Sequence, residues 1–378
     1  MVRGRLSRGL VGGAALVALA VFGGAGAAAG ADARGVPGDV EFWVNPDTAA
    51  ARQVVEWRQR GRIADAWFMG RIAGRAQAEW LYEDTVASAD GTGGTRDVVR
   101  GYVEKATAAG RTAVLVAYFV PHRDCGDYSA GGARDAAHYR AWIDAFADGI
   151  GTHTAYVVVE PDAVAQEVAG CEGADATERY ALLAHAVARL GQQPGAKVYL
   201  DAGNASWIPQ ESRLVEPLRQ AGVDQADGFA LNVSNYRTTE ESTAYGHRLA
   251  RALGGGKHFV IDTSRNGNGP YTGDDKAWCN PPGRALGTPP TTRTGDPAVD
   301  AYLWIKRPGE SDGTCRGGPA AGTWWPEYAL GLAVRARGAH LVSLAPPGVP
   351  GDTGVAGVAG DADAAGARDV PGAQGRQT

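Results

Sequence analysis

The 378-residue chain has little of what several common functional classes require. It carries seven histidines against 42 aspartates and glutamates, which favours carboxylate over imidazole chemistry, and its net charge of −5 leaves no basic surface for nucleic acid. No Gly-x-Gly-x-x-Gly motif follows the first predicted strands, which disfavours a dinucleotide-binding fold. No Cys-x-x-Cys pair or close Cys/His spacing occurs, so the sequence predicts no metal site and no cofactor.

The first 33 residues have the pattern of a secretory signal peptide. Three arginines precede an apolar run at 10–22, and small residues follow with Ala-x-Ala sites that end at Ala29 or Ala33. The apolar run is too short for a comfortable membrane span, although a short anchored segment is the alternative. We therefore expect a secreted, extracellular, monomeric protein with no membrane partner after cleavage.

The four cysteines suit an oxidising compartment, where an even number favours two disulfides. Three pairings are open from the sequence alone. Pairing of nearest neighbours joins Cys125 to Cys171 and Cys279 to Cys315, and each bond then closes a loop near a candidate aspartate.

Short apolar runs alternate with helical patterns from about residue 41 to residue 344. Most of the runs lack polar alternation, as expected of parallel strands that are buried on both faces. Repeated β–α units over about 300 residues fit an α/β barrel better than an open sheet. Strands are predicted at 79–82, 112–120, 154–159, 197–200, 228–233, 258–261, 301–305 and 341–344.

Helices are predicted between these strands, at 95–109, 135–149, 176–190 and 239–253. Thr95 and Asp135 stand where N-caps are expected. Residues 34–345 would form one catalytic domain with a large core. Beyond residue 345 the chain is Gly-, Ala-, Asp- and Pro-rich, so 346–378 is predicted to be a disordered tail.

Carboxylates or amides follow most of the predicted strands, as in Glu160, Asp201, Asn232, Asp262 and Glu310. Polar groups at the carboxyl ends of barrel strands are typical of an active site, and several aspartates there point toward cleavage of sugars. Ten tryptophans against seven phenylalanines fit this idea, because indoles can stack on sugar rings, although any one of them can equally be a core residue.

Three aspartates stand out as candidate catalytic groups. Asp162 follows a buried strand and Pro161, which is expected to hold Glu160 extended. A carboxyl beside apolar residues gains a raised pKa that suits a general acid, while the alternative is an N-cap for the next helix. Asp124 could instead cap a helix or pair with its neighbour in the chain, and Asp312 could instead belong to an Asp-Gly turn.

Longer motifs resemble those of glycoside hydrolase family 6, and the resemblance runs from about residue 42 to residue 335. The motifs are YFVPHRDCG (118–126), VEPD (159–162), YLDAG (199–203), IDTSRNG (261–267), WCNP (278–281), TGDP (294–297) and LWIKRPGESDG (303–313).

The resemblance implies a secreted β-1,4-glucanase on a distorted, TIM-like (β/α) barrel of about seven parallel strands, acting on cellulose with inversion. Asp162 matches the general acid, and Asp124 a neighbour that keeps the proton available through like charge. Asp312 matches the position proposed as the catalytic base, acting directly or through a chain of waters. Inversion implies carboxyl groups roughly 6.5–9.5 Å apart.

The same resemblance implies contacts to β-1,4-glucan, the expected partner. Tyr118 matches a tyrosine that helps to distort the sugar ring, and Ser129 falls in a loop that moves in the family. Trp304 can be a subsite or a core residue. The remaining matches are the stacking tryptophans Trp80, Trp207 and Trp278, the hydrogen-bonding Lys306 and Glu310, and the amide pair Asn232 and Asn235.

Two positions depart from the family pattern: Asn204 stands where histidine is common, and Phe119 where some relatives are polar. The loops around the candidate aspartates leave little chain to roof the site, so we expect an open cleft and an endoglucanase. An exo-acting cellobiohydrolase is the alternative, and a catalytically silent β-glucan-binding protein is a third possibility that the retained aspartates disfavour.

Overall fold

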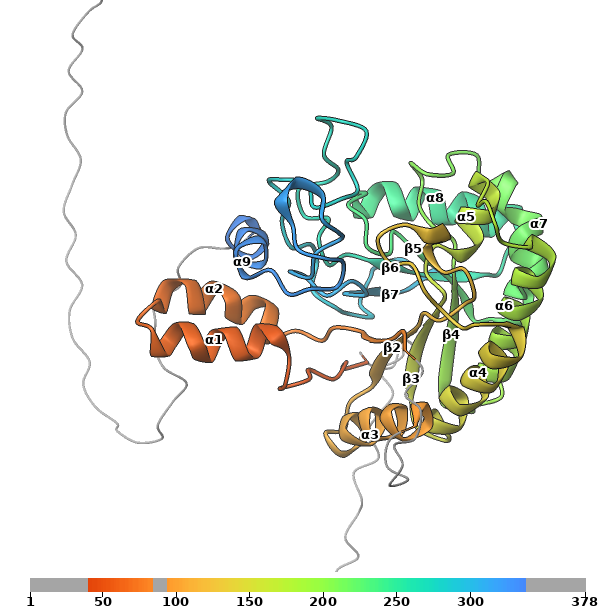
Figure 1. The fold of residues 1–378 in the computed structure, drawn as a ribbon, viewed down its shortest axis with the longest axis horizontal. Helices are drawn as coiled ribbons and strands as arrows, with labels where there is room; N and C mark the ends of the chain where they lie inside the picture. Colours follow the sequence, from red (N-terminus) through yellow and green to blue (C-terminus); the bar gives the residue numbers. More distant parts are fainter. Residues whose placement is uncertain (1–39, 84–93, 338–378) are drawn as a thin grey trace, which may run out of the picture. The chain divides into compact units, whose positions relative to one another are not determined.

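The computed structural model describes residues 40–83 and 94–337. Its centre is one sheet of seven parallel strands, in which each strand pairs with its neighbours in the sequence (Figure 1). This confirms the predicted α/β fold and seven of the predicted strands; the eighth, at 341–344, lies outside the described residues. The strands are β1 (Glu79–Leu81), β2 (Ala113–Ala117), β3 (Ala155–Val159), β4 (Ala196–Asp201), β5 (Gly228–Leu231), β6 (His258–Asp262) and β7 (Val299–Leu303).

Helices cover the outer face of the sheet (Figure 1). The four predicted helices are present with boundaries shifted by at most one residue. Asp135 caps its helix as expected, because its carboxylate accepts from the His138 N–H. The expectation for Thr95 is wrong: it is the first helical residue, and Gly94 holds the N-cap position. The helices are α3 (Thr95–Ala108), α4 (Ala136–Ile150), α5 (Ala163–Ala169), α6 (Ala176–Leu190), α7 (Ser212–Gln220) and α8 (Thr239–Ala252).

Successive side chains of each strand enter two different cores. Ala113, Leu115 and Ala117 of β2 face the layer of helices, whereas Val114 and Val116 face the inside of the curved sheet. This alternation follows from the two-residue period of a strand. Both faces are buried, which explains why the strand sequences are continuously apolar.

Strands β1 and β7 are the two edges of the sheet. Single hydrogen bonds join them, in place of the regular backbone pairing found between the other neighbouring strands. The Ala78 N–H donates to the Trp304 carbonyl at 3.0 Å, and Trp80 Nε1 donates to the Ile305 carbonyl at 2.7 Å. Arg307 adds a hydrogen bond to the Ala78 carbonyl and an ion pair with Glu79. The result is the distorted barrel that the sequence predicted.

A third apolar cluster lies between the antiparallel helices α1 (Ala49–Gln59) and α2 (Ile63–Ala73) and the last helix, α9 (Pro326–Arg335) (Figure 1). Trp304 belongs to this cluster, with 2% of its surface exposed, so it is a core residue. Among residues 40–83 and 94–337, no helix has the length and apolarity needed to cross a membrane. The predicted signal (1–33) and tail (346–378) lie outside the described residues.

The packing of α8 on the sheet provides a test of the fold. A Cβ at Gly246 would lie 2.4 Å from the buried Phe259 ring, whereas a Cβ at Gly101 in α3 meets nothing within 4 Å. We expect Gly246→Ala to lower the free energy of unfolding by about 1–3 kcal/mol through overpacking. The control Gly101→Ala should raise it by up to about 1 kcal/mol through helix propensity. Denaturant unfolding checks both values, and equal stabilities would contradict this packing.

Candidate active site

A groove of about 1020 Å³ opens at the carboxyl ends of the strands. Every sequence-predicted catalytic and substrate-binding residue lines it except Asn232. Those brought together are Asp124, Asp162, Asp312, Trp80, Tyr118, Ser129, Trp207, Asn235, Trp278, Lys306 and Glu310. A second cavity, of about 1150 Å³, lies beside α2 and the start of α8, but Glu240 is its only carboxyl among the described residues. The groove is therefore the candidate site.

Three buried carboxylates hold the loops of this rim. Glu160 accepts from the backbone N–H groups of Phe119 and Val120 after β2. Asp201 accepts from the N–H groups of Asp162 and Gly203. Burial raises the pKa of Glu160 and of Asp201 to about 7, and the backbone hydrogen bonds oppose this rise.

Asp262 performs the same task at β5 to β7, because it accepts from the N–H groups of Ser234, Ser264 and Lys306. The sequence predicted that the three acidic residues lie at the rim, but it did not reveal that they accept hydrogen bonds from the backbone of the loops. The signal that could have revealed it is their position at the end of a fully apolar strand, where a carboxyl has no solvent and must find backbone donors.

The backbone around the candidate aspartates adopts left-handed conformations. The φ angles are 58° at Asp124, 47° at Glu160 and 73° at Asp162. The expectation that Pro161 keeps Glu160 extended is therefore wrong, because the Glu160 carboxylate is held by the end of β2. Such strained residues persist only where surrounding contacts determine them, and they cluster at functional sites.

Asp162 occupies the N-cap position of α5, yet its side chain makes no capping hydrogen bond. The carboxyl instead lines the groove. Burial, followed by the nearby charges of Asp201 and Asp124, raises its pKa well above the ordinary value, and Lys306 opposes the shift only in part. Asp162 is thus set to hold a proton and donate it.

Asp124 lies next to this group and does not pair with Arg123. Its carboxylate accepts from the Ser129 N–H at 2.6 Å and from Gln166 Nε2 at 3.1 Å. Burial raises its pKa, and the Ser129 hydrogen bond counteracts this. Arg123 turns its guanidinium to the carbonyls of Tyr82, Tyr118 and Ser129.

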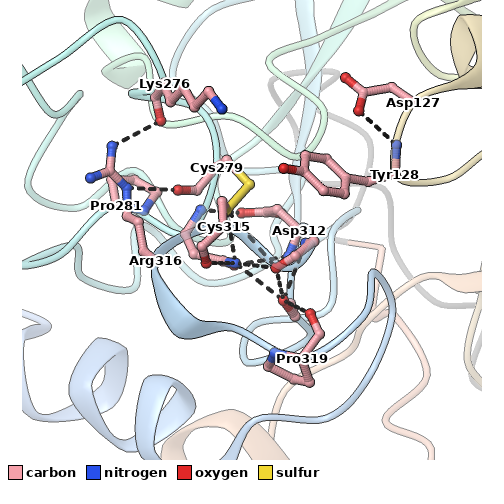
Figure 2. Close-up of a disulfide and its surroundings, with 12 residues drawn as sticks. Asp127, Tyr128, Lys276, Cys279, Pro281, Asp312, Cys315, Arg316 and Pro319 are labelled. Carbon is pink, nitrogen blue, oxygen red and sulfur yellow. Dashed lines mark hydrogen bonds between the residues drawn. A yellow bond between two sulfur atoms is a disulfide. The ribbon is translucent and has the colours of Figure 1, made fainter.

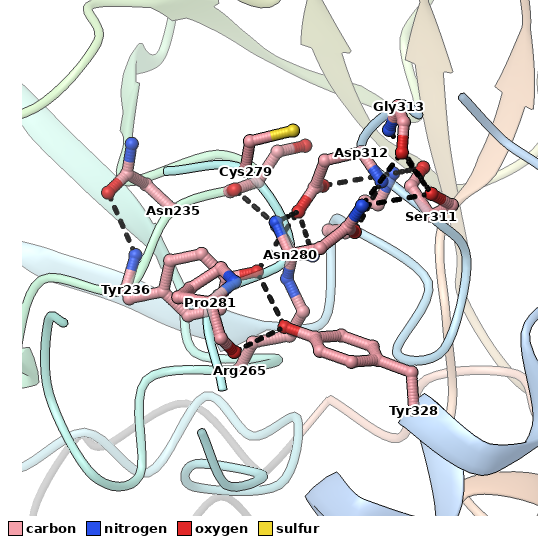
Figure 3. A network of polar contacts seen from close by, with 12 residues as sticks. Asn235, Tyr236, Arg265, Cys279, Asn280, Pro281, Ser311, Asp312, Gly313 and Tyr328 are labelled. Carbon is pink, nitrogen blue, oxygen red and sulfur yellow. Dashed lines mark hydrogen bonds and ion pairs between the residues drawn. The ribbon is translucent and has the colours of Figure 1, made fainter. Parts of the chain in front are cut away.

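Asp312 has the opposite environment (Figure 3). Its Oδ2 accepts from Arg265 Nη1 at 2.9 Å, from the Asn280 N–H at 3.0 Å and from the Tyr236 hydroxyl at 3.0 Å. Burial alone would raise its pKa, but the charges of Arg265 and Lys306, with the hydrogen bonds from Arg265 and Asn280, hold the pKa below its ordinary value. Asp312 therefore remains ionised.

The two oxygens of Asp312 differ. Oδ2 has three donors, whereas Lys306 Nζ lies 3.6 Å from Oδ1, beyond a good hydrogen bond. Lys306 also acts electrostatically on Asp162, so one cation influences both carboxyls. Oδ1 is consequently the oxygen with capacity to accept a proton.

Both nearest-neighbour disulfides are present: Cys125–Cys171 and Cys279–Cys315. The second joins the loop after β6 to the loop of Asp312 (Figure 2). Tyr128, from the loop after β2, packs on Gly313, where a Cβ would lie 2.5 Å from the ring. The Tyr128 ring also lies 6.0 Å from that of Trp278. An aromatic side chain thus joins two loops that line the groove, the loop after β2 and the loop of Asp312.

Aromatic rings line the remainder of the groove. Trp80 meets Tyr118 edge to face at 5.2 Å, and Arg123 lies over the Tyr118 ring at 4.8 Å. Trp278 is 40% exposed, and Trp207 is half-buried. Such flat, partly accessible rings can stack on the apolar faces of sugars.

The two predicted amides occupy different environments. Asn235 lines the groove, whereas Asn232 is fully buried and its amide bonds the carbonyls of Arg237 and Asp262. This burial excludes direct contact between Asn232 and a substrate, and its role here is to hold the backbone after β5. Asn204 similarly accepts from the N–H groups of Ser206 and Trp207 and so shapes the loop that carries Trp207.

Glu310 and Lys306 both reach the groove from the segment after β7. Glu310 pairs with Arg307 at 3.1 Å, which orients its carboxylate. Among residues 40–83 and 94–337, no group of three or more His, Cys, Asp or Glu side chains could hold a metal ion.

The groove thus combines aromatic walls with one carboxyl of raised pKa and one of lowered pKa. The family model for glycosyl hydrolases family 6 matches residues 38–336. The chain belongs to this family. Endoglucanase A of Cellulomonas fimi is 44% identical over 296 residues, which are 78% of this chain and 61% of that protein. The chain thus spans about three fifths of the length of that relative.

A family 6 structure, the endoglucanase Cel6 of Mycobacterium tuberculosis in complex with methyl-cellobiosyl-4-deoxy-4-thio-β-D-cellobioside, matches with a TM-score of 0.72 and 43% identity. The match covers 78% of this chain and 97% of that one. A protein of Aspergillus fumigatus named as a probable 1,4-β-D-glucan cellobiohydrolase C is more distant, at 32% identity over 57% of this chain and 59% of its own.

Sequence reasoning did not assign Arg265, Tyr236, Asn280 or Tyr328 to the site. Arg265 and Asn280 stand within motifs that resemble family 6, so the motifs carried a signal without a role. Their contacts to Asp312 span 47 and 32 residues. No local pattern reveals such contacts.

The buried Arg265–Asp312 pair predicts a pH-dependent stability. Asp312→Asn leaves the guanidinium, whose side chain is 0% exposed, without its anion, and should cost about 3–5 kcal/mol at pH 7. Because the folded pKa of Asp312 is lowered, its stabilisation is present above the unfolded pKa of about 3.9 and disappears as pH falls through the folded value.

The difference between wild type and Asp312→Asn should therefore shrink below about pH 4 in denaturant titrations. Asp47→Asn, which removes an exposed partner of Arg52, should cost little at either pH. A constant difference for Asp312→Asn down to about pH 2 would contradict the lowered pKa.

Proposed function

We propose that this protein is a secreted endo-β-1,4-glucanase that hydrolyses internal bonds of cellulose and related β-1,4-glucans with inversion. The observation that carries the proposal is that one groove holds two carboxyls whose surroundings shift their pKa values in opposite directions. Burial and like charges raise the pKa of Asp162, while Arg265 and Lys306 lower that of Asp312. Titratable groups whose environments push their pKa values apart identify an acid and a base.

In this mechanism Asp162 protonates the glycosidic oxygen as the bond to the anomeric carbon breaks. A water molecule attacks that carbon from the opposite face, and its proton passes to Oδ1 of Asp312, directly or through further waters. Asp124 keeps Asp162 protonated through its charge. Two carboxyls that act on opposite faces, without a covalent intermediate, invert the configuration.

The substrate class is supported by the groove walls and by the relatives. Trp80, Trp207 and Trp278 offer three partly accessible rings along the groove. The Cellulomonas fimi and Mycobacterium tuberculosis relatives are both named as endoglucanases, and the second was solved with a thio-linked cello-oligosaccharide. The signal-like N-terminus and the two disulfides support secretion.

Endo action is supported by the short loops. Asp312 is three residues from Cys315, and α4 fills much of the chain between Cys125 and Asp162. The contact of Tyr128 with Gly313 favours the second candidate, an exo-acting cellobiohydrolase, because it joins the loop after β2 to the loop of Asp312 beside the groove. The silent binding protein is disfavoured, because a binding module has no need of a buried acid with a raised pKa.

The role of Asp162 is tested by Asp162→Asn. We expect hydrolysis of cello-oligosaccharides to fall by about 10²–10⁴-fold, since an amide cannot donate the proton. Calorimetric binding of cello-oligosaccharide should persist, because the tryptophans remain. In the wild type, activity should decline as pH rises through the raised pKa of Asp162, which must hold its proton. Wild-type rates for the variant would refute this assignment.

The mode of attack is tested in a single digest of carboxymethylcellulose and cello-oligosaccharide. Endo action should lower viscosity rapidly while few new reducing ends form. Proton NMR of fresh oligosaccharide products should show the α-anomer first. Slow loss of viscosity with abundant cellobiose would favour the cellobiohydrolase, and β-anomer as the initial product would contradict inversion.

A further inference from the structure

The support of Asp312 extends through a second tyrosine that does not touch it. The Tyr236 hydroxyl lies 3.0 Å from Asp312 Oδ2 and also 3.0 Å from the Tyr328 hydroxyl. The Tyr328 hydroxyl in turn lies 3.3 Å from the Pro281 carbonyl. Figure 3 shows the three contacts in a row, with Tyr328 reaching in from α9.

The two hydroxyls have too few protons for these three contacts. Each phenol carries one hydrogen, so only two of the contacts can be hydrogen bonds at a time. In one arrangement Tyr328 donates to Tyr236, and Tyr236 donates to Asp312. In a second, Tyr236 donates to Asp312 and Tyr328 donates to the Pro281 carbonyl, so the two hydroxyls do not bond each other. In a third, Tyr236 donates to Tyr328, and Tyr328 donates to the Pro281 carbonyl, which leaves Asp312 with Arg265 and Asn280 only.

Distance and the charge on Asp312 decide among the three arrangements. The hydroxyls lie 3.0 Å apart, closer than the 3.3 Å from Tyr328 to the Pro281 carbonyl, which favours the first arrangement over the second. An anionic carboxylate attracts both O–H dipoles, and the donation from Tyr328 polarises the Tyr236 hydroxyl and strengthens its bond to the carboxylate. A protonated Asp312 lacks this attraction, and the carbonyl of Pro281 then becomes a competitive acceptor. Both phenols keep their protons, because burial raises the pKa of Tyr236 and of Tyr328.

The charged groups that face this row are few. Arg265 lies over the Tyr236 ring at 4.4 Å and pairs with Asp312, and Lys306 lies on the far side of the carboxylate. Arg284 and Arg316 act electrostatically on Tyr328. None of these cations can accept a hydrogen bond, so the two hydroxyls alone have a choice of direction.

We propose that Tyr328 is a positioning residue for Asp312: acting through Tyr236, it directs a hydrogen bond to the charged carboxylate and turns away when the carboxylate holds a proton. This inference rests on the proposed function, in which Asp312 takes up a proton in each reaction cycle. It adds α9, near the end of the described chain, to the machinery of the site.

The test is a double-mutant cycle read by the pKa of Asp312. Tyr236→Phe removes the direct donor and should raise that pKa by about one unit. Tyr328→Phe should raise it by about 0.3 units, because it removes only the polarising partner. In the Tyr236→Phe background, Tyr328→Phe should have no further effect, because the relay is already broken.

The pKa is measured by carboxyl ¹³C NMR titration, with Asp312→Asn identifying the resonance. This titration does not depend on hydrolysis. If the wild type proved inactive, the proposed function would fail, but the effect of Tyr328 on Asp312 through Tyr236 could still be tested. On an active enzyme, Tyr328→Phe should lower kcat about twofold, leave KM unchanged and move the acid limb of the pH profile upward.

The matched control is Tyr199→Phe, whose hydroxyl donates to Asp300 Oδ2 at 2.7 Å outside the groove. It should leave the Asp312 titration, kcat and the pH profile as in the wild type. An unchanged Asp312 titration in Tyr328→Phe would overturn the proposal. The proposal would also be overturned if Tyr328→Phe shifted the Asp312 pKa equally with and without Tyr236. A third contrary result would be a loss of stability in Tyr328→Phe with no change in the Asp312 titration or in kcat.

Discussion

The site depends on hydrogen bonds that backbone N–H groups donate to buried carboxylates. The strands end in apolar surroundings, and the loops that follow need partners for their amides. Glu160, Asp201 and Asp262 provide them and hold strained backbone that carries the reactive groups. Asp201, for example, accepts from the N–H group of Asp162, whose backbone is left-handed.

The same burial gives two carboxyls opposite behaviour. Asp162 is buried near the like charges of Asp201 and Asp124, and Lys306 offsets these effects only in part, so its neutral form is favoured. Asp312 is equally enclosed but contacts a guanidinium, a backbone amide and a phenol, so its charged form is favoured. Lys306 acts on both, which couples the two ends of the reaction centre. Burial therefore raises the pKa of both carboxyls, and the charged partners decide whether the net shift is upward or downward.

The structure also joins segments that are remote in the chain. Helix α9 reaches the site through Tyr328, and the loop after β2 reaches the loop after β7 through Tyr128 and Gly313. The Cys279–Cys315 disulfide links the loop after β6 to the loop that carries Asp312 (Figure 2). Each of these links holds a loop of the groove in place without adding a catalytic group. This is consistent with a barrel scaffold whose loops carry the functional residues.

The sequence by itself determined the order of seven strands, four of the helices and most of the residues that line the groove. It could do so because strand burial, helix periodicity and long motifs are local properties. It misjudged Glu160, Thr95 and Asn232, where contacts to distant segments or a neighbouring glycine outweighed local preference. Only the tertiary structure decided which aspartate holds a proton, because that depends on partners dozens of residues away and on the water that folding removes.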